Sequence, residues 1–183
     1  NEKGISLLSF EQVTTLFHEF GHALHGLLSD ANYPSLSGTN VTRDYVEFPS
    51  QMMENWAREP AVIAEYAKHY ETGKSMPLDL LDKISKAGQF NQGFATTEYV
   101  AASYLDMAWH SQEEKVTDAN QFEKETLNEI GLIDQITSRY RSTYFAHIFA
   151  GGYSMGYYSY LWTEVLEADA FQPFKEKGIF DKE

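Results

Sequence analysis

"TLFHEFGHALHG", Thr15 to Gly26, places two histidines four residues apart, with a glutamate directly after the first. In a helix, residues i and i+4 lie on one face about one turn apart, so His18 and His22 can both face one ion. Glu19 is rotated about 100° from His18 around the helix axis. It is poorly placed to be a ligand, yet close enough to reach a metal-bound water. The stretch therefore predicts a zinc site with its own general base.

The residues around this motif predict the helix that carries it. Ser9 and Gln12 have the spacing of a capping box, and Gly21 lets another backbone or a substrate approach closely. Apolar residues follow the cap at intervals of three and four, as on a helix. They are Phe10, Val13, Leu16, Phe17, Phe20, Leu24, Leu27 and Leu28. The five-letter motif also occurs by chance, so a helix with buried, satisfied histidines remains an alternative.

A catalytic zinc ion typically has three protein ligands and one open position. The best candidate for the third ligand is Glu47 in "DYVEFPSQMMENW", 25 residues after His22 and beyond a polar loop at 29–44. Glu54 lies two turns further along the same helix face, where it either supports a ligand histidine or is a solvated surface carboxylate. His25 is expected in the core or beside the site rather than on the metal.

The rest of the chain predicts a mainly α fold with little β structure. A second helix is expected from about Glu47–Pro49, broken or kinked at Pro60 and continuing to residue 71. Further helices are expected within 76–88, 94–111 and 118–131, and after the glycine-rich stretch at 150–156. No linker divides the sequence, so we expect one helical domain over residues 1–183.

Composition excludes several classes of partner. The formal net charge of −13 argues against nucleic acid, whose recognition relies on clustered Lys and Arg. The absence of cysteine excludes disulfides and thiolate ligands. No apolar run approaches the roughly 20 residues of a membrane-spanning helix. Residue 1 is not Met and the first strong pattern begins at Ser9, so we expect a piece of a longer chain.

"FHEFGHALHG" followed by "GTNVTRDYVEFPSQMMENW" resembles the catalytic core of the thimet-oligopeptidase-type metallopeptidases, which include oligopeptidase A and the peptidyl-dipeptidases. The resemblance covers essentially the whole chain and implies a multi-helical zincin-type core. It implies that His18, His22 and Glu47 hold one Zn²⁺ ion per chain and that Glu19 is the general base.

The C-terminal stretch "FAHIFAGGYSMGYYSYLW" carries candidates for the rest of the chemistry. Peptide hydrolysis passes through an oxyanion that needs hydrogen-bond donors, and His and Tyr can supply them; an aromatic helix packed in the core is the alternative. The family has a histidine, a glycine-rich turn and then tyrosines seven residues apart. By resemblance, His147, Tyr153 and Tyr160 bind substrate and stabilise the oxyanion.

The resemblance also implies substrates and context. "HIFAGGY" is more similar to the peptidyl-dipeptidase branch, which implies release of dipeptides from the free C-termini of short peptides. An endo-acting oligopeptidase of the same family is the alternative. Family members are much longer, so an upstream helical portion is expected to complete the substrate channel, and the family is usually cytoplasmic.

Two hypotheses from other classes stay open at this point. One is a non-catalytic peptide-binding module with a structural metal, in which His25 or a carboxylate would be the fourth ligand. The other is an oligomeric helical core protein without metal. The glutamate of the motif argues against the structural site, because such a site has no use for Glu19.

Overall fold

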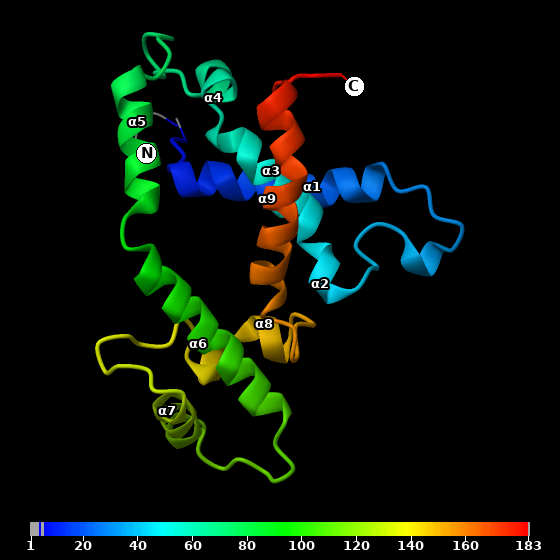
Figure 1. Ribbon diagram of the computed structural model, residues 1–183, viewed down its shortest axis with the longest axis vertical. Coiled ribbons are helices and arrows are strands. Elements are labelled where there is room, and N and C mark those ends of the chain that lie inside the picture. The colour runs from blue at the N-terminus through cyan, green and yellow to red at the C-terminus, as the bar shows by residue number, and fades with distance from the viewer. Residues whose placement is uncertain (1–3, 5, 183) are drawn as a thin grey trace. The chain divides into compact units, whose positions relative to one another are not determined.

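The computed structural model describes residue 4 and residues 6–182 (Figure 1). Helices dominate, and within the described part of the chain the only strand-like pairing is an isolated bridge between Lys68 and Ser75. The mainly α fold predicted from the sequence is confirmed. The chain divides into two compact units, one of residues 1–83 with 160–183 and one of residues 84–159. The single domain over 1–183 stays a prediction.

The first unit contains the HEFGH stretch and the second candidate segment. Its helices are α1 (Phe10–Leu27), α2 (Arg43–Val46), α3 (Phe48–Arg58), α4 (Pro60–Tyr66) and nearly all of α9 (Ser159–Lys177), with a 3₁₀ turn at Pro34–Leu36. Helix α5 (Leu78–Gln89) runs across the division between the units. No helix in the described residues is both long enough and apolar enough to span a membrane.

Helix α1 begins where the sequence predicts. The Ser9 hydroxyl accepts from the Gln12 N–H at 3.2 Å, and the Gln12 side-chain oxygen accepts from the Ser9 N–H at 2.8 Å. This reciprocal capping box satisfies two backbone donors that the first helical turn leaves unpaired.

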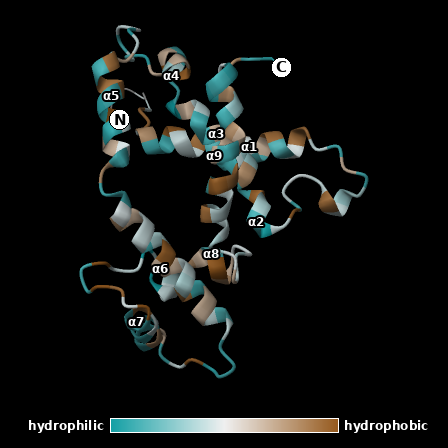
Figure 2. Ribbon diagram, viewed as in Figure 1, coloured by the Kyte–Doolittle hydropathy of each residue, from teal (hydrophilic) through white to brown (hydrophobic). Residues whose placement is uncertain are grey.

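The apolar residues that predict α1 are only partly turned toward the first unit. Leu16, Phe20 and Leu27 are 58%, 52% and 77% exposed. Phe17 is half-buried, and its ring centroid lies 6.0 Å from that of Tyr66. Figure 2 shows apolar character at the end of α1 that carries Leu27. The fully buried residues of α1, Thr14 and Gly21, are small.

Helices α1 and α3 touch backbone to backbone at Gly21. A Cβ atom built at Gly21 would lie 2.5 Å from the Pro49 carbonyl oxygen and 2.5 Å from the Ser50 Cα atom. No side chain fits there without moving a helix. The predicted close approach at Gly21 is confirmed, and the approaching backbone is that of α3.

Pro60 divides α3 from α4, as predicted. Glu59 is extended, with φ −72° and ψ 127°, because a residue before proline disfavours helical geometry. The prediction that the helix continues to residue 71 is wrong, since α4 ends at Tyr66. The chain turns back through Gly73, whose φ of 67° suits a tight turn, and the His69 N–H donates to the Lys74 carbonyl at 2.8 Å.

Helix α9 packs along α3 through an aromatic cluster and a polar pair. The ring centroids of Trp56 and Phe171 are 5.0 Å apart in an edge-to-face arrangement, and Phe171 is 2% exposed. The Asn55 amide donates to the Glu167 carboxylate. Burial raises the pKa of Glu167, and this hydrogen bond opposes that rise. The aromatic contact buries apolar surface between the two helices and so stabilises their packing.

The second unit is built around α6 (Gln92–His110). Helices α7 (Ala119–Glu129) and α8 (Ala146–Phe149) and a 3₁₀ turn at Ser142–Tyr144 complete it. Its fully buried apolar side chains come from α6 and from the segment after residue 144. They include Ala101, Ala102, Leu105, Phe145, Ile148 and Tyr157. The three helices predicted in 76–88, 94–111 and 118–131 are present as α5, α6 and α7, but α5 ends one residue after its predicted stretch and α6 begins two residues before its own.

Replacing Gly21 by Ala tests the α1–α3 contact. We expect Gly21→Ala to lower the free energy of unfolding by about 1–3 kcal/mol, because the added methyl overlaps backbone atoms that cannot rotate away. Gly26→Ala on the same helix is the matched control, since a Cβ there meets nothing within 4 Å. The control should be neutral or stabilising by about 0.5–1 kcal/mol. Urea unfolding measures both, and equal stabilities would contradict the proposed backbone contact.

Candidate metal centre

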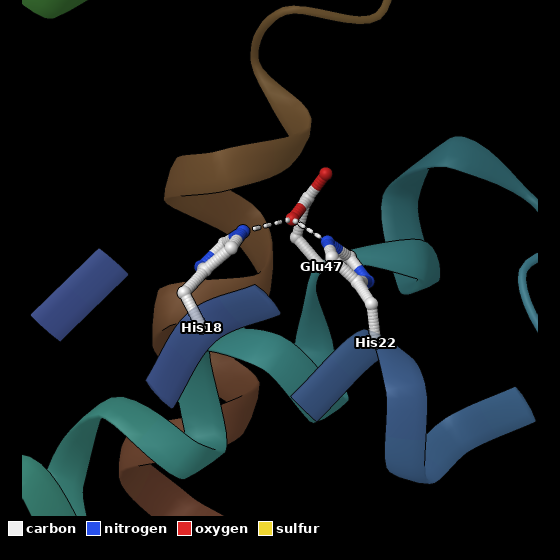
Figure 3. Close-up of side chains that lie close together, drawn as sticks. All are labelled: His18, His22 and Glu47. Atoms are coloured by element: carbon white, nitrogen blue, oxygen red, sulfur yellow. Dashed lines mark ion pairs between the residues drawn. The ribbon is translucent and has the colours of Figure 1, made fainter. Parts of the chain in front are cut away.

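Three side chains of the first unit converge on one point (Figure 3). His18 Nε2 lies 3.1 Å and His22 Nε2 lies 3.2 Å from the same Glu47 carboxylate oxygen, Oε2. One ligand atom from each residue lies within 4.8 Å of the others. Ligands at about 2.0–2.1 Å from a tetrahedral zinc ion are about 3.4 Å apart. The two nitrogen–oxygen separations therefore fit ligation of a common ion after small side-chain adjustments.

Glu47 is aimed at the histidines by its place between two helices. It ends α2 and precedes the first residue of α3, and it is 2% exposed. The Ser50 hydroxyl lies 2.8 Å from the Glu47 main-chain carbonyl and 3.0 Å from its Oε2 atom. A buried carboxylate is costly unless its charge is compensated. The two imidazole rings or a bound cation supply that compensation.

Glu54 contacts the other nitrogen of His18. The distance from His18 Nδ1 to Glu54 Oε1 is 2.8 Å. A hydrogen bond donated by Nδ1–H to Glu54 leaves Nε2 free to bind a metal, and it fixes the plane of the ring. Of the two interpretations open for Glu54, support of a ligand histidine is the one that the geometry favours.

The carboxylates of Glu47 and Glu54 contact the two ring nitrogens of His18 and favour a positive charge there. Burial lowers the pKa of His18, but hydrogen bonds to Glu47 and Glu54 outweigh this effect and raise that pKa to about 9. In the metal-free protein the ring is therefore protonated at neutral pH. A metal ion that binds Nε2 takes the place of that proton, so binding releases a proton to solvent.

His25 and Glu19 lie on α1 but outside the three-residue group. The His25 ring is half-buried and packs edge-on against Tyr45, with ring centroids 6.3 Å apart. Only His18, His22 and Glu47 form a potential metal-binding group among the described residues. Three protein ligands leave a coordination position open, as in catalytic sites. Glu19 follows His18 directly and is exposed.

Helix α3 also fixes the start of α9, where Tyr160 lies. The Gln51 amide nitrogen donates to the Tyr160 carbonyl at 3.0 Å, and its amide oxygen accepts from the Thr163 hydroxyl at 2.5 Å. Gln51 is four residues after Glu47, so one helix holds both the carboxylate and the first turn of α9. Tyr160 thus belongs to the same unit as the metal group.

His147 and Tyr153 belong to the second unit and lie near one another. The Tyr153 N–H donates to the His147 carbonyl at 3.0 Å, and the two rings are 6.2 Å apart. Tyr157 is 3% exposed and packs on His147 and Phe145. Burial raises the pKa of Tyr157 despite the opposing charge of Arg139. Tyr157 is therefore packed in the core, which is the alternative left open for the aromatic residues of this stretch, whereas Tyr158 is exposed.

Two residues of this centre are absent from the sequence-based prediction. Ser50 and Gln51 follow Glu47 by three and four residues, and this helical spacing is the signal that could have found them. The partner of Gln51 could not have been found in that way, because Thr163 lies 112 residues from it.

Comparison with known proteins identifies the family. Residues 1–183 match the model of peptidase family M3. The chain belongs to peptidase family M3. Its M3 relatives include the dipeptidyl carboxypeptidase of Salmonella typhimurium, 49% identical over 181 residues, and the oligopeptidase A of Escherichia coli, 42% identical over 183 residues. In both cases 97% of this chain is covered. The resemblance stated from the motifs and the expected helical zincin-type core are confirmed.

The M3 match covers only part of each relative. The chain spans 27% of the length of both proteins. A more distant M3 relative, mitochondrial intermediate peptidase 1 of Cryptococcus neoformans, is 30% identical over 178 residues, and the chain spans 23% of it.

Zinc affinity tests the role of Glu54. We expect Glu54→Gln to weaken Zn²⁺ binding by roughly ten- to a hundredfold, because the neutral amide holds the His18 ring less firmly and raises its basicity less. Competition with a chromophoric chelator measures the affinity. Glu65→Gln is the control, since the Glu65 side chain is 84% exposed and 3.9 Å from Lys68. Unchanged affinity in Glu54→Gln would remove Glu54 from the centre.

Proposed function

We propose that this chain is the catalytic core of a zinc metallopeptidase that releases dipeptides from the C-termini of short peptides. One observation carries the proposal: His18, His22 and Glu47 converge on one point, and the exposed Glu19 follows His18 directly on the same helix. The donor set of two imidazoles and one carboxylate is typical of catalytic zinc in peptidases. His18, His22 and Glu47 would hold one Zn²⁺ ion per chain.

A bound zinc ion would supply Lewis-acid activation of the scissile carbonyl and of the attacking water. Glu19 supplies the proton transfer. Its carboxylate accepts a proton from the water as the carbon–oxygen bond forms, and it donates that proton to the amide nitrogen as the carbon–nitrogen bond breaks. Its place one residue after His18, on an exposed side of α1, supports this role.

We assign stabilisation of the oxyanion to hydrogen-bond donors from the aromatic segment, residues 145–162. In the proposal, Tyr153 donates its hydroxyl hydrogen to the developing charge, with His147 or Tyr160 as a further donor. The contact between the Tyr153 backbone and His147 supports the pairing of these two residues. The bond from Gln51 to Tyr160 supports a fixed position for Tyr160 beside the metal-bearing helix α3.

The sequence identities to known relatives favour the peptidyl-dipeptidase branch over the oligopeptidase branch. The dipeptidyl carboxypeptidase of Salmonella typhimurium is 49% identical to the chain, whereas oligopeptidase A of the same organism is 40% identical. We infer that the activity belongs to a longer protein, in which an upstream helical portion completes the substrate channel. A cytoplasmic location follows only from the family resemblance and stays a prediction, as does the absence of nucleic-acid and membrane partners.

A non-catalytic binding module with a structural metal is the second candidate from another class. Structural zinc has four protein ligands. The group among the described residues offers three, and His25 packs against Tyr45 rather than joining it. The observations therefore favour the peptidase.

Glu19→Gln separates metal binding from proton transfer. We expect the variant to keep its zinc, because Glu19 is not a ligand, and to lose turnover by roughly 10²–10⁴-fold. Metal analysis and hydrolysis of a quenched fluorescent peptide by the full-length protein measure the two properties. Glu11→Gln, on the first turn of the same helix, is the control. Turnover within a factor of two of the wild type would exclude Glu19 as the general base.

The choice of scissile bond tests the proposed activity. The zinc-loaded full-length protein is incubated with one peptide in two forms, a free and an amidated C-terminus, and the products are identified by mass spectrometry. We expect stepwise loss of dipeptides from the free form only. Internal cleavage of both forms would reassign the protein to endo-acting oligopeptidases. Cleavage of neither, with zinc present, would favour the binding module.

A further inference from the structure

Asp106 is a buried carboxylate that the proposed mechanism does not use. It lies on α6 in the second unit and is 1% exposed. Its neighbours in the helix are apolar or small, with Ala101, Ala102 and Leu105 buried beside it. Burial of an unpaired carboxylate is costly, so its partners show what it stabilises.

Both oxygens of Asp106 accept backbone hydrogen bonds from one turn. Oδ1 accepts from the Met155 N–H at 3.0 Å, and Oδ2 accepts from the Tyr157 N–H at 2.9 Å. His110 Nδ1 lies 2.8 Å from Oδ1. Asp106 is 49 and 51 residues from its two backbone partners, so this is a tertiary contact rather than a local cap.

The turn needs this support because its backbone is strained. Met155 has φ 56°, in the left-handed region that residues with a side chain rarely adopt. Gly152 precedes it with φ 78°. A residue held in such a conformation persists only where its surroundings impose it. The carboxylate of Asp106 receives the N–H of Met155 itself and that of the residue two further on.

The same turn sets the position of Tyr153. Its N–H donates to the main-chain carbonyl of His147 at 3.0 Å, and its own carbonyl accepts from the Gly156 N–H at 2.8 Å. The Ser154 hydroxyl donates to the Ile148 carbonyl at 2.8 Å. Tyr153 is therefore fixed on one side by the end of α8 and on the other by the residues that Asp106 holds.

We propose that Asp106 is a positioning residue for Tyr153: its carboxylate holds the 153–157 turn in the strained form that presents Tyr153 beside His147. The proposal rests on the proposed peptidase function, because it concerns the tyrosine assigned to the oxyanion. It adds a residue that contacts neither metal nor substrate, and that acts through the geometry of the turn.

Asp106→Asn is the test variant, because it keeps shape and volume. The amide oxygen still accepts one N–H, but the amide NH₂ group faces the other N–H, donor against donor. In the full-length zinc-loaded protein we expect kcat to fall at least roughly tenfold, as small displacements of catalytic groups do. We expect KM to change less than kcat and zinc content to stay the same.

A double-mutant cycle with Tyr153→Phe distinguishes positioning from general stability. If Asp106 acts through the Tyr153 hydroxyl, Asp106→Asn should have little further effect on kcat/KM once that hydroxyl is gone. A loss of the same size in both backgrounds would overturn the proposal. Unchanged kcat in the single variant, with wild type active and Tyr153→Phe impaired, would also overturn it.

Asp118→Ala is the matched control in the same unit. The Asp118 carboxylate also accepts two backbone N–H bonds, both at 3.0 Å, but from Asn120 and Gln121 at the start of α7. We expect it to lower the melting temperature without changing kcat. An equal loss of kcat in Asp118→Ala would reduce the effect of Asp106 to general stability and overturn the proposal.

Two further readouts cover poor folding and failure of the proposed function. Asp106→Glu keeps both acceptor oxygens and replaces Asp106→Asn in the cycle if the latter does not fold. Amide hydrogen exchange of Met155 and Tyr157 should accelerate in either variant, with the start of α7 unchanged.

A wild-type protein without peptidase activity would overturn the proposed function and this inference together. An active wild type with unaffected Asp106 variants would overturn the inference alone.

Discussion

The contact of the α1 and α3 backbones at Gly21 is the constraint on which the candidate metal centre depends. Because no side chain separates the helices there, the Pro49–Ser50 backbone lies against α1 at Gly21, the residue directly before His22. Glu47 precedes that contact by two residues and is carried to both imidazoles at 3.1 and 3.2 Å. A wider helix separation would move the carboxylate away from the short histidine side chains. The glycine of the HEFGH stretch therefore serves the geometry of the site without binding anything.

The residues buried between α1 and α3 are small. The separation of packed helices depends on the side chains at their contact, and small residues there allow the close approach at Gly21. They are Thr14 and Gly21 on α1 and Ser50 and Ala57 on α3. Aromatic contacts elsewhere in the unit include the cluster of Trp56, Phe171 and Phe174 between α3 and α9 and the pair of Phe17 and Tyr66 between α1 and α4. Other apolar residues of α1, Leu16, Phe20 and Leu27, are exposed.

The sequence predicted what local rules determine. The capping box at Ser9, the break at Pro60 and the presence of helices α5 to α7 follow from short-range chemistry, and each is confirmed. The i, i+4 spacing was sufficient to put His18 and His22 on one face. Glu47 was within reach because only one polar loop separates it from α1. The extension of α4 to residue 71 was wrong, because the turn around Gly73 closes through a hydrogen bond from His69 to Lys74 that no helical periodicity reveals.

Contacts between distant segments were beyond sequence reasoning. Asp106 lies on an alanine-rich helix whose apolar positions predict core packing, and nothing in the sequence marks it as the acceptor for the N–H of Met155, 49 positions further along the chain. The contact of Gln51 is also hidden in the sequence, since its partner Thr163 lies 112 residues away on α9. In both cases a polar side chain holds the backbone near a tyrosine of the aromatic segment: the buried Asp106 near Tyr153, and the half-buried Gln51 near Tyr160. A buried polar group is costly unless it is hydrogen-bonded, so the bonds that Asp106 accepts from two backbone N–H groups offset the cost of burying it.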